Sequence, residues 1–286
     1  MKTFYITHQN RKTLLDQIKP CVVALGFFDG VHLGHQKVIK TAVKIAKQKN
    51  VQAAVMTFSP HPKEVINKQK VGYLTSIETK QKIFQNLGVE FLYLIQFDSQ
   101  FSVLSPREFT QNYLVDFQIE HVVAGDDFTY GFHGKGNMRN IVSDGLGSYT
   151  ATTIEQFQFQ GKKISSTRIR TIIKEGNVGF LPHLLGDFYK TNGVVKKREV
   201  PSNRDSIYKV YLDEECLLPR PGTYKVMIQT EEKNFEATIH RYGEKDNIIY
   251  MIPYGLQILG ENQRINIKWL KCLSIKRKTG CASTVS

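Results

Sequence analysis

Residues 21–36 read Cys-Val-Val-Ala-Leu-Gly-Phe-Phe-Asp-Gly-Val-His-Leu-Gly-His-Gln, and this stretch decides the fold of the first part of the chain. Its apolar residues 22–25 predict a buried strand, a glycine-bearing turn follows, and a helical pattern runs over 36–49. A strand, a tight turn and a helix start together point backbone N–H groups and the positive helix end at a phosphate. His32 and His35 lie at that mouth, where two imidazoles would place cationic donors on the oxygens of a phosphoryl group under attack.

After this stretch, short apolar runs alternate with helical patterns. The runs that predict strands are 51–58, 91–97, 121–124 and 150–157, and the helical patterns are 77–87, 106–117 and 166–175. Strands separated by helices indicate a parallel sheet with right-handed crossovers. Ligands of such sheets bind beyond the carboxyl ends of the strands, where the histidine pair is expected. We therefore predict an α/β fold with a Rossmann-like parallel-sheet domain over residues 1–186.

The pattern changes after about Gly186. Segments that alternate or carry β-branched residues then follow one another between turn signals, and they cover 194–195, 207–212, 223–230, 234–241, 248–252 and 264–275. Such a succession is typical of a compact antiparallel β domain. We predict a smaller antiparallel β-barrel over residues 187–286.

Composition limits the class of protein. Of the 286 residues, 41% are hydrophobic, which is enough to form real cores and excludes wholesale disorder. The formal net charge of +13 is spread over both parts, which favours anionic small molecules such as nucleotides and does not specifically indicate nucleic acid. The four cysteines lack zinc-site spacing, and neither a signal-peptide core nor a membrane-spanning stretch is visible. We expect a soluble, cytoplasmic protein whose oligomeric state stays open.

Three further motifs carry polar or aromatic groups. Residues 56–62, Met-Thr-Phe-Ser-Pro-His-Pro, end a strand and enter a loop that two prolines would hold as a rigid turn. Residues 125–131, Gly-Asp-Asp-Phe-Thr-Tyr-Gly, also follow a strand; the acids would bind a metal or stay solvated, and the aromatics would receive a flat ring. Residues 165–170, Ser-Ser-Thr-Arg-Ile-Arg, predict either a phosphate clamp at a helix start or an ordinary cap beside exposed arginines.

An isolated H-x-G-H motif is more typical of two structural histidines near a turn. Here the motif lies between a strand and a helix and follows Gly26 and Asp29-Gly30, which favours a functional pair. The arrangement suits attack on the α-phosphate of ATP, because donors at this place stabilise charge on that phosphate and on the departing pyrophosphate. This chemistry requires no covalent nucleophile, and the sequence offers no convincing one.

Taken in order, the four motifs resemble the bacterial FAD synthetases, the bifunctional riboflavin kinase/FMN adenylyltransferases of the H-x-G-H nucleotidyltransferase superfamily. The resemblance runs nearly without interruption from about Cys21 to Tyr189 and includes 26–36, 57–65, 74–88, 125–131 and 165–170. It implies transfer of AMP from Mg-ATP to the phosphate of FMN, which gives FAD and pyrophosphate. Mg²⁺ would enter with ATP, and the resemblance assigns it no protein ligands.

The resemblance also implies roles for individual residues. His32 and His35 would engage the ATP phosphates and the transition state, and Ser166 and Arg170 would hold the triphosphate, so that these four form the catalytic set. The implied ATP-binding residues are Gly26, Phe27, Phe28, Asp29, His32, Gly34, His35, Ser166, Thr167 and Arg170. The implied FMN-binding residues are Phe58, Pro60, His61, Asp127, Phe128 and Tyr130.

Two departures from the family pattern stand out. Members commonly carry Asn where this chain has Phe27, and the lost amide removes a hydrogen bond near the nucleotide, which bears on activity or nucleotide preference. The kinase motif Gly-Phe-Pro-Thr-Ala-Asn of the family is also incomplete, because residues 193–203 keep only the Pro and the Asn. We therefore expect a barrel that has lost riboflavin kinase activity. A fully bifunctional enzyme and a catalytically weak flavin- or nucleotide-binding regulator are the alternatives.

Overall fold

The computed structural model describes residues 1–199, 206–213, 216–243 and 247–275. The chain divides into two compact units, Met1–Ser165 and Ser166–Ser286. The residues between 166 and 186, which the sequence pattern groups with the first domain, thus belong by their contacts to the second unit. Among the described residues, no helix combines the length and the apolar character needed to cross a membrane.

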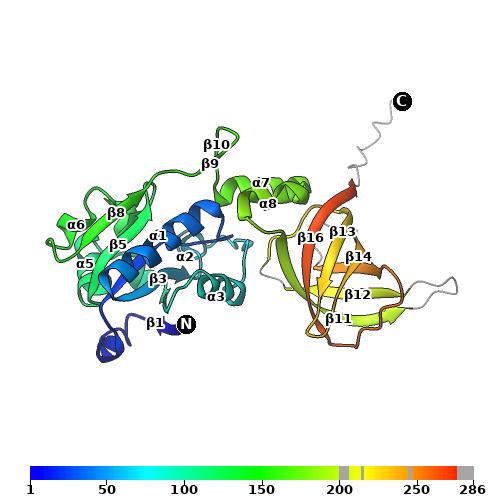
Figure 1. Cartoon of the computed structure of the whole chain (residues 1–286), viewed down its shortest axis with the longest axis horizontal. Coiled ribbons are helices and arrows are strands. Elements are labelled where there is room, and N and C mark those ends of the chain that lie inside the picture. The colour runs from blue at the N-terminus through cyan, green and yellow to red at the C-terminus, as the bar shows by residue number, and fades with distance from the viewer. Residues whose placement is uncertain (200–205, 214–215, 244–246, 276–286) are drawn as a thin grey trace. The chain divides into compact units, whose positions relative to one another are not determined.

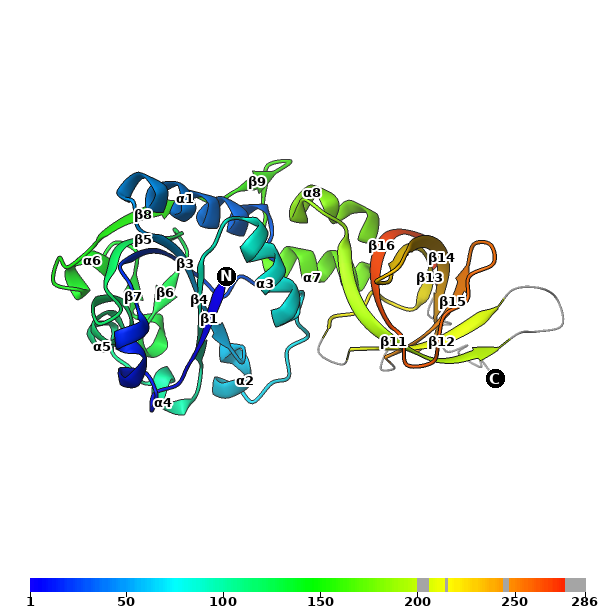
Figure 2. The same cartoon turned by 60° about the horizontal axis from the view of Figure 1, so that its bottom comes forward.

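The first unit is built on a six-stranded sheet whose neighbouring strands all run parallel, as Figures 1 and 2 show. The strand order is β1-β4-β3-β2-β5-β8. The strands are β1 (Lys2–Ile6), β2 (Cys21–Leu25), β3 (Gln52–Ser59), β4 (Phe91–Gln96), β5 (Ile119–Gly125) and β8 (Thr150–Ile154). The predicted Rossmann-like parallel sheet is confirmed.

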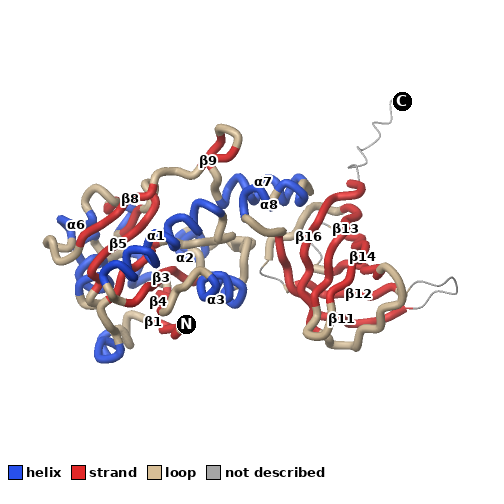
Figure 3. The backbone as a smooth tube through the Cα atoms, viewed as in Figure 1, coloured by secondary structure: helices blue, strands red, loops and turns tan. Residues whose placement is uncertain are grey.

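Helices and one short hairpin connect the strands of this sheet, and a second hairpin follows its last strand, β8 (Figure 3). The α-helices are α1 (Leu33–Lys49), α2 (Pro62–Ile66), α3 (Ile77–Asn86), α4 (Ser99–Ser102), α5 (Pro106–Thr110) and α6 (Ile141–Asp144). Short segments of other helix types are η1 (Lys12–Gln17), the π-helical η2 (Gln111–Val115) and η3 (Phe132–Gly134). The hairpins pair β6 (Thr129–Tyr130) with β7 (Gly136–Asn137), and β9 (Gln158–Phe159) with β10 (Lys162–Lys163).

Apolar clusters cover both faces of the parallel sheet. Every residue of β2 is buried, and its side chains alternate between the two clusters, so that Val22 and Ala24 join one while Val23 and Leu25 join the other. The first cluster contains the apolar stripe of α1 and Phe84 of α3. Burial on both faces explains why β2 reads as a continuous apolar run and not as an alternation.

The second unit begins with α7 (Ser166–Glu175), η4 (Val178–Phe180) and α8 (Pro182–Leu185), and it continues into a closed antiparallel barrel. The strand order around the barrel is β11-β12-β15-β14-β13-β16. The strands are β11 (Tyr189–Glu199), β12 (Ile207–Leu212), β13 (Gly222–Gln229), β14 (Asn234–Arg241), β15 (Ile248–Pro253) and β16 (Arg264–Ile275). The predicted β-barrel is confirmed.

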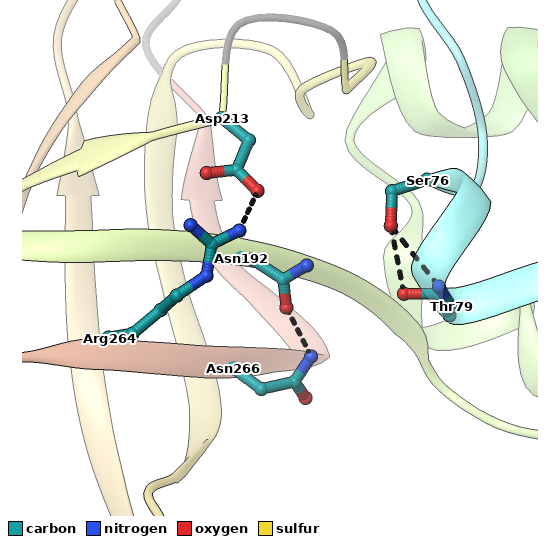
Figure 4. Close-up of polar contacts among 6 residues, drawn as sticks. All are labelled: Ser76, Thr79, Asn192, Asp213, Arg264 and Asn266. Atoms are coloured by element: carbon teal, nitrogen blue, oxygen red, sulfur yellow. Dashed lines mark hydrogen bonds and ion pairs between the residues drawn. The ribbon is translucent and has the colours of Figure 1, made fainter. Parts of the chain in front are cut away.

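Polar contacts reinforce the pairing of β11 with β16 on the barrel surface. The Nδ2 of Asn266 donates to the Oδ1 of Asn192 directly across the two strands at 2.8 Å, as Figure 4 shows. Arg264 of β16 forms an ion pair of 3.0 Å with Asp213, which follows β12. The incomplete kinase motif continues beyond this pairing, and its part at 200–203 lies outside the described residues.

Candidate active site

The turn between β2 and α1 is a strained and buried piece of backbone. Phe28, Gly30 and Val31 have φ angles of 50°, 83° and 37°, and a β-branched residue such as Val31 rarely adopts a positive φ. Phe28 and Val31 are each only 1% exposed, so that packing into the core holds the strained conformation. A Cβ on Gly26 would lie 2.9 Å from the Phe28 ring, and only glycine therefore fits at the end of the strand.

The histidine pair stands where this turn enters α1. His32 is the N-cap residue of the helix, and its Nδ1 accepts a hydrogen bond of 3.2 Å from the backbone N–H of His35. Because Nδ1 acts as the acceptor, the ring proton of His32 lies on Nε2, which is left as a donor. The two rings stack with centroids 3.6 Å apart and planes 18° from parallel. A Cβ on Gly34 would approach the His32 ring to 3.2 Å, so this glycine permits the stacking.

Both imidazoles are neutral in this environment. Burial lowers the pKa of His32 from its ordinary value to about 4, against the effect of the nearby Asp127 carboxylate, which raises it. Burial holds the pKa of His35 well below its usual range, and the neighbouring His32 and Lys80 lower this pKa further. The cationic donors expected from the sequence are therefore neutral N–H donors in the ligand-free protein. The Nδ1 of His35 is buried and has no hydrogen-bond partner among the described residues.

Hydrogen bonds made by three side chains hold this turn in place. The buried carboxylate of Asp29 accepts hydrogen bonds from the backbone N–H of Leu74 at 3.0 Å and of Thr75 at 3.3 Å. The carbonyl oxygen of Phe27 accepts from the Thr57 hydroxyl at 2.9 Å and from the Lys80 ammonium at 3.2 Å. Asp29 thus holds the turn in place through the loop before α3. Lys80 was missed from the sequence, because helical spacing alone does not mark a lysine as buried.

The ring of Phe27 lies against the loop that follows β3. It meets the His61 ring edge-on at 4.4 Å, lies 6.4 Å from the Tyr73 ring, and has the Lys80 ammonium 4.5 Å from its centroid. Tyr73 in turn accepts from the backbone N–H of His61 at 2.9 Å and donates to Glu64 at 2.8 Å. Phe27 and His61, two of the predicted ligand-binding residues, are therefore in direct contact.

Of the other residues predicted to bind FMN, some are exposed and some are buried in the core of the first unit. Asp127 is exposed and forms a 2.7 Å ion pair with Lys163 of β10, and it lies near enough to His32 to influence its pKa. Phe58 and Tyr130 are buried in the core, where Tyr130 donates to Asp144 at 2.6 Å. Phe128 stacks beside Tyr130, with ring centroids 6.1 Å apart. Among the described residues, no cluster of three or more His, Cys, Asp or Glu side chains forms a metal centre.

The predicted phosphate clamp forms the start of α7 in the second unit. Ser166 is the first residue of α7, and the helix has the bounds that the sequence predicts. Ile169, Ile172 and Ile173 make the buried face of the helix, whereas Thr167 is exposed and Ser166 and Arg170 are half-buried. Ser166, Thr167 and Arg170 therefore lie outside the buried face of α7.

Fold and site together define the Rossmann-like class of proteins that carry an H-x-G-H motif after a central parallel strand. The family model for FAD synthetase matches residues 15–168, and the chain belongs to this family. It is 37% identical to a bifunctional riboflavin kinase/FMN adenylyltransferase of Listeria monocytogenes, over 94% of this chain and 88% of that protein. It is 35% identical to the protein of the same name from Bacillus subtilis, over 97% of this chain and 92% of that protein.

The fold has also been observed in a crystal. A structure described as a macrolide-efflux protein from Streptococcus pneumoniae superposes with a TM-score of 0.86 at 25% identity, covering 99% of this chain and 94% of that one. The arrangement of a parallel-sheet unit followed by a barrel is therefore not peculiar to this chain.

Proposed function

We propose that this chain makes FAD by transferring AMP from ATP to the phosphate of FMN, with release of pyrophosphate. The observation that carries the proposal is the stacked, buried His32–His35 pair at the strained turn after β2, within a chain that belongs to the FAD synthetase family. An FMN phosphate oxygen forms the new bond to the α-phosphorus of ATP, and the bond from that phosphorus to the α,β-bridging oxygen breaks. The leaving pyrophosphate takes that electron pair.

In this reaction the imidazoles act as neutral donors. The Nε2–H of His32 donates to a phosphate oxygen, and His35 offers its ring nitrogens beside it, where charge on the α-phosphate and on the leaving group develops. Ser166, Thr167 and Arg170 bind the triphosphate, while His61 and Asp127 contact FMN. Mg²⁺ enters with ATP, held largely by ATP oxygens and water. Residues 1–186 carry this activity, and residues 187–286 form a riboflavin-kinase-like barrel without kinase activity.

The purified chain is expected to convert FMN and Mg-ATP to FAD and pyrophosphate and to leave riboflavin unphosphorylated. Chromatography of the flavins, with FMN and riboflavin supplied in separate reactions, measures both activities. FMN formed from riboflavin at a rate comparable with FAD synthesis would establish the bifunctional enzyme, which the names of the relatives favour. Flavin or nucleotide binding without any product would instead indicate the regulator.

Arg170→Ala is expected to raise the KM for ATP by about 10- to 100-fold, because a hydrogen bond to a charged group contributes roughly 1.5–3 kcal/mol. Initial rates of FAD formation over a range of ATP concentrations measure the change. Lys174→Ala is the matched control, since Lys174 is an exposed cation in the last turn of the same helix. Equal KM values in the two variants would remove Arg170 from the ATP site.

A further inference from the structure

The helix α1 carries most of the positive charge of the parallel-sheet unit. Residues 1–165 contain 19 Lys+Arg and 13 Asp+Glu, which gives a net charge of +6. Five of these basic residues are lysines of α1, and the helix has no acidic residue. The rest of the unit, with 14 basic and 13 acidic residues, is therefore nearly neutral. The charge of this unit is concentrated on one helix.

Four of the five lysines form a row along the outer side of α1. Spacings of three, four and three residues place their side chains on one side of an α-helix. The lysine row consists of Lys37, Lys40, Lys44 and Lys47, all of which are exposed. It extends along the helix for about 15 Å, at 1.5 Å per residue. The opposite side of α1 packs onto the parallel sheet, as Figure 2 shows.

The chain does not neutralise this row. Among the described residues, Lys40, Lys44 and Lys47 form no ion pair and no side-chain hydrogen bond. The fifth lysine, Lys49, pairs with Glu120 at 3.6 Å, but it lies off the row. Like charges three or four residues apart destabilise a helix. A row that costs stability and is not neutralised within the chain is explained by a negatively charged partner outside it.

An exposed aromatic ring lies at the first end of the lysine row. Phe157, which precedes β9, is 38% exposed, and the Nζ of Lys37 lies 5.8 Å from the centroid of its ring. A Cβ on Gly34 would lie 3.4 Å from the Cβ of Phe157, so Phe157 is packed against the first turn of α1. Proteins bind single-stranded nucleic acids with this combination, because cations contact the phosphates while bases stack on aromatic rings.

We propose that the lysine row and Phe157 form a binding surface for a single-stranded nucleic acid. The phosphates of the strand follow the row, and a base at the end of the row stacks on Phe157. A lone triphosphate is too short to contact four cations spread over about 15 Å. A membrane surface is disfavoured as well, because the apolar side of α1 is buried in the unit and is not available for insertion. The inference is independent of the proposed FAD synthesis.

The test measures binding of a fluorescein-labelled RNA strand of about 12 uridines, a length within the usual site sizes, to the full chain. Fluorescence anisotropy gives the Kd between about 50 and 200 mM KCl. Each phosphate contact on a single strand contributes about 0.7 to the slope of log Kd against log[KCl], so four contacts predict a slope of about 3. A strand of thymidines shows whether the 2′-hydroxyl contributes, and binding of either strand supports the proposal.

Two triple variants separate the row from net charge. The row variant combines Lys40→Gln, Lys44→Gln and Lys47→Gln. The control variant makes the same change at three exposed lysines elsewhere in the unit, Lys12→Gln, Lys19→Gln and Lys82→Gln. We expect the row variant to lower the slope by about 2 and to raise the Kd at the lowest salt by at least about tenfold. The control variant should keep the wild-type slope. Equal losses in both variants would overturn the proposal, because net charge alone predicts them.

Substitutions of Phe157 test the stacking. Phe157→Ala should raise the Kd by about tenfold and leave the slope unchanged, whereas Phe157→Trp, which keeps an aromatic surface, should bind like the wild-type protein. Equally tight binding of a duplex of the same length would overturn the proposal, and so would binding of phosphatidylserine vesicles with the same dependence on the row. Displacement of the RNA by Mg-ATP, beyond the effect of KCl at equal ionic strength, would place the RNA in the nucleotide site and would also overturn it.

Discussion

His35→Ala is expected to lower the kcat of FAD synthesis from FMN and Mg-ATP by about 100- to 1000-fold, because it removes donors from the place where phosphate charge develops. The imidazole stacks on His32 at 3.6 Å and meets the Phe28 ring edge-on at 5.2 Å, so the ring is held in one orientation before any ligand binds. Steady-state rates at saturating ATP and FMN measure the loss. The circular dichroism spectrum should stay that of the wild-type protein.

His32 needs a two-variant design because its side chain has two tasks. His32→Ala removes both the donor on Nε2 and the helix cap on Nδ1, and loss of a cap costs about 1 kcal/mol of stability. His32→Asn keeps a capping oxygen, since asparagine is a good N-cap residue, and it removes only the imidazole. We expect both variants to lose activity to a similar extent, whereas only His32→Ala should melt at a lower temperature. Full activity in His32→Asn would limit His32 to a structural role.

The elements around the site could be predicted from the sequence wherever one local signal decides. The buried run of β2 and the amphipathic stripe of α7 are such signals, and the structure has α7 at the predicted bounds. Where tertiary pairing decides, prediction fell short. β1 was not predicted, since its five residues become a strand by pairing with β4. The predicted helix over 106–117 is confirmed as helical over residues 106–115, but the sequence did not indicate that it changes from the α to the π form at Gln111.

In the candidate site, too, features with a local sequence signal could be predicted, whereas features that depend on tertiary contacts could not. The H-x-G-H motif and its turn mark themselves by residue type and spacing, and the structure brings the two histidines together. Nothing local marks Lys80, whose partner Phe27 lies 53 residues earlier in the chain. The protonation state of the pair was also misjudged, because burial of the imidazoles depends on elements packed around them and not on the motif. A motif therefore predicts neither the contacts that distant residues make with it nor how deeply its side chains are buried.

Trp269→Ala is expected to destabilise the barrel by about 3–5 kcal/mol, the usual cost of deleting a large buried aromatic side chain. Trp269 is fully buried on β16, packs edge-on against Tyr224 at 5.2 Å, and donates through Nε1 to the Thr191 hydroxyl at 3.0 Å. Its removal leaves a cavity and an unpaired hydroxyl between β11 and β16. Because this is the one tryptophan of the chain, its fluorescence reports barrel unfolding in the wild-type protein, and calorimetry measures the variant.

Trp269→Phe is the matched control, since it keeps an aromatic ring against Tyr224 and loses the donor to Thr191. We expect it to cost about 1 kcal/mol beyond the change in ring size, as for one hydrogen bond. FAD synthesis should persist in both variants below their melting temperatures, because the proposal assigns that reaction to residues 1–186. A folded Trp269→Ala protein that makes no FAD would mean that the barrel supports the start of α7, which belongs to the same compact unit. FAD synthesis would then require the second unit as a whole and would not be confined to residues 1–186.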